Sequence, residues 1–358
     1  MSTRRRFLGT SLAALVALAA PTGCSRIDRG EDAPARDLGA AAEVRLGYFP
    51  NVTHASALIG VDKGLFAREL GGTALTTQTF NAGPDAVNAL LGSSLDVAYL
   101  GSGPAINAYA KSGGEAVRLV AGAVSGGAQL VVKPGLGSAA DLRGKVVTTP
   151  QLGNTQDVAL KKWLADQGLP AGAGPNQVVV TNTENSKTLD LFRRGDVHAA
   201  WAPEPWSSRL VLEAGAEVLL DEAELWDGGR FPTTVVLVRT RFLQEHPSTV
   251  EALLRGHLAA TDLARSDEAE AKRVVNAALE RLTGKALGER VLDRAFDHIE
   301  LTPDPLAGTF PRLAQDAVTA GVADRAANVA GLADLTLLNA VLTEAGRPAV
   351  DTAGLDEK

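Results

Sequence analysis

The sequence predicts an α/β protein with two doubly wound lobes and a central ligand cleft. Segments with the periodicity of strands and helices alternate along the chain, and this alternation occurs twice. The chain has 358 residues, 45% of them hydrophobic, which is enough for two domains that each bury a core. Strands and helices joined by right-handed crossovers form mostly parallel sheets. Two such units therefore predict two lobes.

The first unit begins at an alternating apolar segment that breaks at Pro50. A helix follows in which Gly64 is a break or an end. A threonine-rich strand, a helix with Pro84 in its first turn, and a short apolar strand complete the unit. In order, the expected elements are a strand over 44–48, a helix over 55–66, a strand over 73–80, a helix over 84–91 and a strand over 96–100.

The second unit repeats this order, with a strand over 145–149, a helix over 155–167, a strand over 177–181 and a helix over 186–193. The best internal match joins LLGSSLDVAYLGSGP, residues 90–104, to LFRRGDVHAAWAPEP, residues 191–205. Each segment ends a helix, turns, runs Asp-Val into a strand of small residues and stops at proline. Chance similarity among small residues is the alternative interpretation.

Two apolar strands, 129–133 and 233–239, flank the second unit and are the expected places for the chain to cross between lobes. The predicted division assigns 43–128 plus 237–348 to lobe 1 and 129–236 to lobe 2. From His246 onward the pattern is helical. We expect this tail to pack on lobe 1.

Residues 1–23 have the pattern of an export signal: a basic start at Arg4-Arg5-Arg6 and an apolar run of about 12 residues, shorter than the ~20 of a spanning helix. The paired arginines resemble a twin-arginine signal. The only cysteine, Cys24, follows a small residue, as in a bacterial lipoprotein box, and is the expected lipidation site. The alternative is a thiol in a discarded peptide. Residues 24–42 are expected to carry the lipidated cysteine and a flexible tether.

Ligands of open parallel sheets bind where strand ends meet helix starts. The corresponding loops are 50–54, 101–104, 125–127, 151–156 and 201–206, and they are rich in hydroxyl and amide side chains and glycine. In the stretch PQLGNTQDVAL, residues 150–160, Asn154 or Thr155 can cap the helix while the remaining donors face a cleft. Ordinary capping explains any single loop, whereas five loops at equivalent strand ends favour a binding site.

Signals for catalysis are weak. The five histidines lack metal-binding spacing, and no nucleophile elbow, phosphate loop or dinucleotide motif occurs. We therefore predict a binding protein without enzymatic activity, cofactor or metal. The net charge of −7, with no basic run beyond the N-terminus, argues against a nucleic-acid partner.

Five motifs carry a family resemblance: GYFPNVTHA at 47–55, DKGLF at 62–66, GSGPA at 101–105, NTQD at 154–157 and EPW at 204–206. Together, over about 43–345, they resemble the type II periplasmic solute-binding proteins of ABC importers for nitrate, aliphatic sulfonates and taurine. The resemblance implies a small-molecule ligand, a permease and an ATPase as partners, and a monomer. It also implies export to the periplasm or the outer face of the cell membrane, with a lipid anchor.

By resemblance, the ligand contacts are Asn51, Thr53, His54, Ser102, Gly103, Ser125, Gly126, Gln151, Asn154, Thr155, Gln156, Trp201, Glu204, Phe231 and Thr234. Glu204 could hold an amine or pair with Arg209. The loops lack the arginine that some sulfonate-binding relatives place on the anion, although neutral donors and helix ends can hold one.

Two alternatives remain. The tryptophans near the loops would suit a binding protein for a thiamine precursor, riboflavin or another heterocycle. Enzymes that make the thiamine pyrimidine share the fold, but they carry a cysteine-rich iron motif that this sequence lacks.

Overall fold

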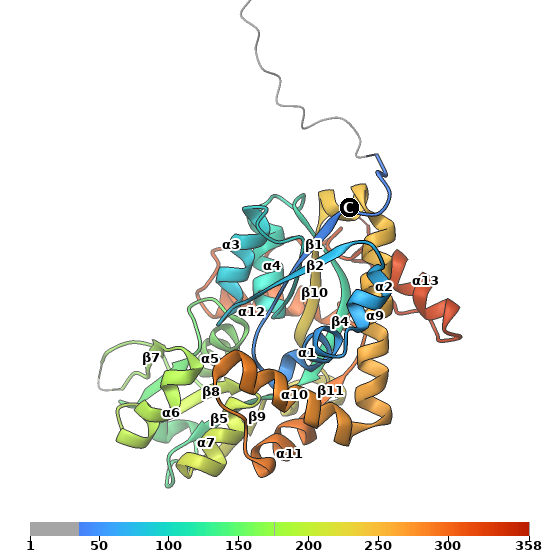
Figure 1. Ribbon diagram of the computed structural model, residues 1–358. Helices are drawn as coiled ribbons and strands as arrows, with labels where there is room; N and C mark the ends of the chain where they lie inside the picture. Colours follow the sequence, from blue (N-terminus) through green and yellow to red (C-terminus); the bar gives the residue numbers. More distant parts are fainter. Residues whose placement is uncertain (1–35, 175, 358) are drawn as a thin grey trace, which may run out of the picture. The chain divides into compact units, whose positions relative to one another are not determined.

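The computed structural model describes residues 36–174 and 176–357, which belong to one compact unit. The expected export signal, Cys24 and the first part of the expected tether lie outside the described residues. The chain forms two lobes, each built on its own β-sheet (Figure 1).

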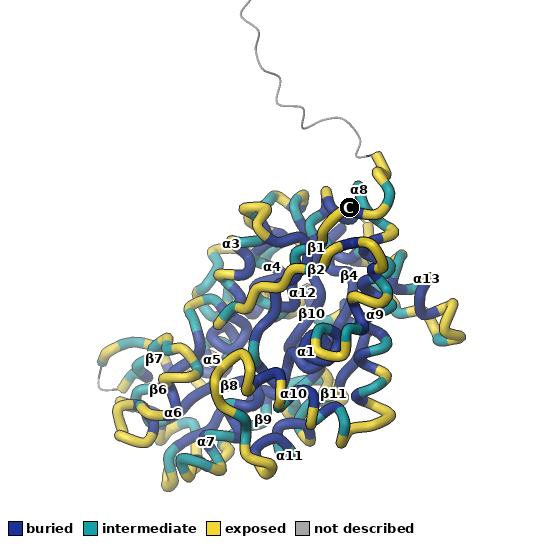
Figure 2. Tube along the Cα trace, viewed as in Figure 1, coloured by how far each residue is buried: buried dark blue, intermediate teal, exposed yellow. Residues whose placement is uncertain are grey.

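The sheet of lobe 1 has six strands in the order β11-β4-β10-β3-β1-β2. Strand β1 pairs in parallel with β2 and β3, whereas β10 runs antiparallel to β3 and β4, and β11 runs antiparallel to β4. The central strands are buried, while β2 at the edge is largely exposed (Figure 2). The strands are β1 (Glu43–Tyr48), β2 (Ala74–Thr79), β3 (Val97–Leu100), β4 (Val117–Gly126), β10 (Pro232–Arg239) and β11 (Ile299–Leu301).

The sheet of lobe 2 has five strands in the order β7-β6-β8-β5-β9. Strand β6 pairs in parallel with β7 and β8, and β5 runs antiparallel to β8 and β9. The strands are β5 (Ala128–Val132), β6 (Val146–Thr149), β7 (Val179–Asn182), β8 (Ala199–Pro203) and β9 (Glu217–Asp221).

The two sheets share one arrangement, in which β2-β1-β3-β10-β4 corresponds to β7-β6-β8-β5-β9. Each sheet is parallel only in its first three strands, so the expectation of mostly parallel sheets holds for that part alone. The remaining strands are antiparallel because the chain crosses between the lobes twice. The first crossing is Gly127, between β4 and β5, and the second runs through the short helices η3 (Glu222–Leu225) and η4 (Asp227–Gly229). Since β10 belongs to the sheet of lobe 1, the second crossing ends before Pro232, earlier than the expected boundary at 236.

Helices follow the strands much as the periodicity predicts, except that one expected helix is divided into two. The helix expected over 55–66 is two helices, because Gly64 adopts a left-handed conformation with φ of 64° that ends the first and starts the second. The helices of this part are η1 (Val52–His54), α1 (Ala55–Asp62), α2 (Leu65–Leu70), α3 (Gly83–Leu91), α4 (Ser102–Lys111), η2 (Ala139–Leu142), α5 (Thr155–Asp166), α6 (Asn185–Arg194) and α7 (Trp206–Ala214).

The C-terminal tail packs on both lobes rather than on lobe 1 alone. Helices α9 and α10 pack against α1, and α13 packs against α9. Helix α11 instead packs against α7, and α12 packs against both α4 and α5 (Figure 1). The tail elements are α8 (Thr240–Glu245), α9 (Pro247–Ser266), α10 (Glu268–Thr283), α11 (Glu289–Asp297), η5 (Ala307–Thr309), α12 (Phe310–Thr319) and α13 (Thr336–Glu344).

The cores of the lobes are separate. One large apolar cluster surrounds the sheet of lobe 1 and includes the inner faces of α9, α10 and α13. The sheet of lobe 2 has a cluster on each face: Leu160, Trp163 and Trp201 lie in one, and Leu189 and Phe192 lie in the other. Helices that cover both faces of a sheet are the arrangement expected of a doubly wound fold.

Residues 38–41, which the sequence assigns to the tether, lie against the start of α9. The Leu38 N–H donates to the Glu245 carbonyl at 2.8 Å, and the Ala41 N–H donates to Thr249 Oγ1 at 2.8 Å. These bonds use backbone N–H groups, so apolar periodicity gives no sign of them.

Within 36–174 and 176–357, the structure has no helix that is both long and apolar enough to span a membrane.

The two Asp-Val motifs allow a matched test of how burial changes the contribution of one carboxylate to the free energy of unfolding. Asp96, at the start of β3, is 2% exposed and accepts hydrogen bonds from Arg45 at 2.7 Å and Arg239 at 2.6 Å. The Arg45 and Arg239 guanidinium groups and the Arg45 N–H hold the pKa of Asp96 below its usual range, although burial acts against them. Its counterpart Asp196 is exposed and pairs with Arg194.

We expect Asp96→Ala to lower the free energy of unfolding by about 2 to 3 kcal/mol, because two partly buried guanidinium groups lose their shared anion. Asp196→Ala should change it by less than about 0.5 kcal/mol. Urea unfolding at pH 7 measures both variants, and equal losses would contradict this account.

Candidate functional site

A small cavity lies where helices from both lobes begin. Its volume is about 30 Å³. Lobe 1 contributes the starts of α3 and α4 together with η1, and lobe 2 contributes the starts of α5 and α6. The lining residues are Phe49, Asn51, Thr53, His54, Asn81, Ala82, Gly83, Gly101, Pro104, Pro150, Asn154, Thr155, Gln156, Asn185, Pro203, Thr233 and Thr234.

The electrostatics of this cavity come from the backbone. The first turns of α3, α4, α5 and α6 have free N–H groups, and each helix N-terminus carries a partial positive charge. The lining residues include no lysine, arginine, aspartate or glutamate. The cavity therefore combines a positive field with neutral hydrogen-bonding side chains, which is the environment of an anion site.

His54 ends η1, and its ring is 2% exposed. The Phe49 N–H donates to Nδ1 at 3.3 Å, so the neutral ring carries its proton on Nε2. Burial lowers the pKa of His54 to about 3. The imidazole is thus a neutral hydrogen-bond donor at physiological pH.

Two hydroxyl groups near the cavity make no hydrogen bond to another described residue. Thr234 Oγ1 on β10 is buried and belongs to the cavity wall. Ser102 Oγ is buried in the first turn of α4, next to the lining residue Gly101. Buried hydroxyl groups in folded proteins almost always have a partner. Thr234 can supply a hydrogen bond to a ligand at no cost to the protein's own network.

The start of α5 shows how one loop both caps a helix and lines the cavity. Asn154 Oδ1 accepts the Asp157 N–H at 2.8 Å, which is the N-cap hydrogen bond, and Asn154 Nδ2 donates to Gln156 Oε1 at 3.1 Å. Thr155 Oγ1 accepts the Gly103 N–H of α4 at 3.3 Å, across the two lobes. Asn154 is the cap, so Thr155 and the Gln156 amide group remain at the cavity.

Seven of the residues expected to contact ligand line this cavity: Asn51, Thr53, His54, Asn154, Thr155, Gln156 and Thr234. The remaining eight lie elsewhere. Ser102 and Gln151 are beside it in the same loops, and Gly103 lines a second, larger cavity. Ser125 and Gly126 lie at the first crossing, where Ser125 Oγ accepts the Phe231 N–H at 3.2 Å.

The aromatic side chains expected at the ligand are part of the packing. Trp201 is fully buried in the core of lobe 2, where its indole N–H donates to Glu222 at 2.7 Å. Phe231 is buried at the second crossing and stacks on Trp226, with 6.0 Å between ring centroids. Both rings are packed in the interior because the strand and the crossing segment that carry them run through it.

Glu204 is a structural ion-pair residue rather than part of the cavity wall. Its carboxylate is fully buried and accepts hydrogen bonds from Arg294 of α11 and from the Ser208 N–H, both at 3.2 Å. Burial raises the pKa of Glu204, and these two donors oppose the rise. Arg209, the partner considered from sequence, pairs with Glu213 instead.

Arg294 extends this contact into a network between the tail and lobe 2. It donates to Ser208 Oγ at 2.8 Å and to Gln129 Oε1 at 2.7 Å, in addition to Glu204. Nearby, the indole N–H of Trp206 donates to Asn51 Oδ1 at 2.9 Å, which joins α7 of lobe 2 to the loop after β1. These contacts hold the lobes together around the cavity.

Several lining residues were missed from the sequence. Asn81 and Gly83 follow strand β2, and Asn185 follows strand β7. The rule that ligands meet the ends of parallel strands holds for these two strands as well as for the more apolar ones. Both strands were expected from the sequence, but they lie at sheet edges and carry polar residues, which makes their ends less conspicuous.

Two α/β lobes joined by two crossings around a cavity define the architecture of periplasmic binding proteins. Residues 39–279 match the model of the NMT1-like family, and the chain belongs to that family. Among solved structures, the chain is similar to the alkanesulfonate-binding protein SsuA of Xanthomonas axonopodis pv. citri bound to MOPS, with a TM-score of 0.66 and 22% identity, covering 85% of this chain and 98% of that one. The nitrate-binding protein NrtA of Synechocystis PCC 6803 has a TM-score of 0.69 and 16% identity, covering 85% and 89%.

Curated relatives from Brucella abortus and Brucella suis carry only the name of binding proteins. Each is 26% identical over 214 residues, which is 59% of this chain. The match spans 63% of the length of those relatives.

His54 makes stability depend on pH with a definite sign. Because its pKa in the folded protein, about 3, lies below the 6.5 of the unfolded chain, the unfolded state binds a proton first as the pH falls. As the pH falls from 6 to 4, His54 therefore lowers the free energy of unfolding by about 1.4 kcal/mol for each pH unit. In His54→Asn this part of the slope should disappear.

Urea unfolding of both proteins at several pH values measures the difference. Parallel curves for the parent and His54→Asn over pH 4 to 6 would contradict the assignment of a buried, neutral ring.

Proposed function

We propose that the protein is the solute-binding component of an ABC importer that captures a small anion, of the organosulfonate, taurine or nitrate kind, in the interlobe cavity. The observation that carries this proposal is the convergence of the N-termini of α3, α4, α5 and α6 on a cavity with neutral walls. Free N–H groups and dipole ends can hold an anion without a cationic side chain. The names of the structural relatives, a sulfonate-binding and a nitrate-binding protein, support the same class of ligand.

The division of the donors between the lobes supports capture by closure. Thr53, His54 and Thr234 belong to lobe 1, whereas Asn154 and Gln156 belong to lobe 2. Neither lobe alone surrounds a ligand, so bringing them together completes the hydrogen-bonding shell and excludes water. Polar contacts are stronger in such an enclosed site. Separation of the lobes would expose the ligand again and allow its delivery to a membrane permease with its ATPase.

A role in binding rather than catalysis fits the chemistry of the cavity. His54, with a pKa of about 3, is too weak a base to accept a proton near neutral pH. Within the part of the chain that the structure describes, no three His, Cys, Asp or Glu residues cluster as metal ligands would. Trp201 lies in the core and Trp206 is not among the residues that line this cavity, so neither offers a stacking surface for a heterocycle there.

Export and anchoring complete the proposed role. The basic start, apolar run and Cys24 in the sequence support secretion with a lipid on that cysteine. A binding protein tethered to the outer face of the membrane would stay close to its permease.

A substitution at Thr234 should change ligand affinity without lowering the stability of the fold. Thr234→Val replaces a buried, unpartnered hydroxyl with a methyl group of similar shape, so the free energy of unfolding should stay the same or rise by up to about 1 kcal/mol. The affinity for the anion should fall about tenfold, because a hydrogen bond to a charged group is lost. Isothermal titration with the ligand found in a thermal-shift panel of nitrate, taurine and alkanesulfonates measures the affinity.

Thr181→Val is the matched control. Thr181 also has a buried hydroxyl with no partner among the described residues, but it lies on β7 outside the cavity wall. Its affinity should equal that of the parent. Equal affinities in all three proteins would place the ligand somewhere other than this cavity.

A further inference from the structure

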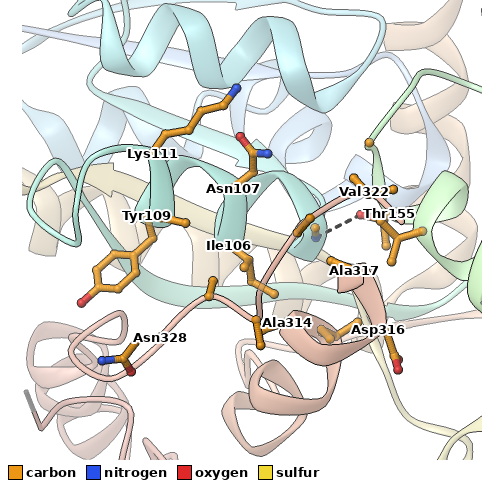
Figure 3. A pocket seen from close by; sticks show the side chains of 18 of the residues that line it. Ile106, Asn107, Tyr109, Lys111, Thr155, Ala314, Asp316, Ala317, Val322 and Asn328 are labelled. Carbon is orange, nitrogen blue, oxygen red and sulfur yellow. Dashed lines mark hydrogen bonds between the residues drawn. The ribbon is translucent and has the colours of Figure 1, made fainter. Parts of the chain in front are cut away.

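A second, larger cavity adjoins the first one. Its volume is about 780 Å³, and it lies between α4 of lobe 1, the tail helix α12 and α5 of lobe 2 (Figure 3). The loop over 322–330, together with Glu222 and Trp226 of the second crossing, completes its walls. Because it has walls from both lobes, its shape depends on how the lobes meet.

The two cavities share one lining residue. Thr155 lines both of them. Its hydroxyl accepts the Gly103 N–H at 3.3 Å, the dashed contact in Figure 3, which is longer than most such bonds. The neighbouring Gly101 allows this approach, since a Cβ atom there would lie 2.2 Å from Thr155 Oγ1. The Thr155 side chain, its hydrogen bond to Gly103 and the close approach of the two backbones form this part of the wall, since a Cβ atom at Gly103 would lie 3.3 Å from Thr155 Cα.

The larger cavity has mostly uncharged walls. Ile106, Val158, Ala314 and Val322 are among its apolar lining residues. Burial raises the pKa of Glu222 to about 8, so this carboxyl group is mainly protonated at pH 7. This apolar part of the surface suits hydrocarbon. Charged lining residues lie at the end of α4 and beyond it, at Lys111 and Glu115, and in the 322–330 loop, at Arg325.

One of the charged residues that line this cavity, Asp316, lies close to two basic side chains. Asp316 of α12 lies 3.7 Å from Arg312 and 4.0 Å from Lys162 of α5. A ligand entering here would meet an ion-pair cluster with balanced charge rather than an open carboxylate.

We propose that the two cavities form one site for an organic anion, with the acid group at the helix N-termini and an uncharged tail of several carbons in the larger cavity. This inference rests on the proposed function and specifies its substrate class. Thr155 then stands at the junction of head and tail. For the tail to pass between them, the hydrogen bond to Gly103 has to break and the first turns of α4 and α5 have to separate.

The volumes decide between an inorganic and an organic ligand. The smaller cavity, at about 30 Å³, has room for about two water molecules, which is enough for an acid group and no more. The larger one, at about 780 Å³, is in the range of small-molecule sites, roughly 300 to 1,000 Å³. A nitrate ion would leave it unused, whereas an alkyl or aryl sulfonate would bury apolar surface there.

The test is a series of methane-, butane- and octanesulfonate, titrated into the full chain. Each added methylene should tighten binding roughly twofold to fourfold until the cavity is filled, because burying a methylene contributes about 0.8 kcal/mol. Ala317→Phe places a ring in the larger cavity from α12. It should weaken octanesulfonate at least tenfold and leave methanesulfonate within twofold of the parent.

Gln315→Phe, on the exposed face of the same helix and outside the cavity, is the matched control and should bind all three sulfonates like the parent. Ala159→Phe fills the cavity from α5 and replaces Ala317→Phe in the same titrations if Ala317→Phe does not fold.

Each outcome bears on a separate proposal. If methanesulfonate binds but longer chains bind no better, or if Ala317→Phe weakens all three ligands equally, the larger cavity does not hold the tail and the inference is overturned while the proposed function stands. If no sulfonate of any length and no nitrate binds, the proposed function fails together with the inference.

Discussion

One buried ion pair lies at the centre of the contacts between the tail of the chain and lobe 2. Arg294, from a tail helix that continues the chain of lobe 1, meets the fully buried Glu204 of lobe 2 and also binds Ser208 and Gln129. A buried carboxylate without its partner would be costly, so the pair favours this one position of α11 against α7. That position also brings the Thr53 N–H to the Glu204 carbonyl, at 3.4 Å, and aligns the walls of the cavity.

Charge and hydrogen bonding are thus separated in space. Full charges fasten the lobes to each other, at Arg294 with Glu204 and near Lys162 with Asp316, outside the smaller cavity. Inside that cavity, backbone dipoles and neutral side chains provide the field. A site made of partial charges can hold an anion and still release it when the lobes part, because no strong ion pair with the ligand has to be broken.

The double crossing of the chain explains why each sheet contains antiparallel strands. Strand β10 completes the sheet of lobe 1 after the chain has returned from lobe 2, and β5 begins lobe 2 directly after β4. Each lobe therefore contains an antiparallel strand next to its third parallel strand. Gly127 has φ of 75° and is the whole of the first connection, so a small change of backbone angles there can move one lobe against the other.

The sequence by itself determined the order of strands and helices, the two-lobe class and a cap at Asn154 or Thr155, because periodicity and capping are local patterns. The family resemblance pointed to seven residues of the smaller cavity, and the structure selected Asn154 as the cap. Only the tertiary structure decided the role of Glu204, whose partner lies 90 positions away, and the docking of α11 and α12 on lobe 2. It also decided that Trp201 and Phe231 belong to packed interiors and that a large cavity adjoins the small one. Such features arise from packing between distant segments, for which a local pattern contains no signal.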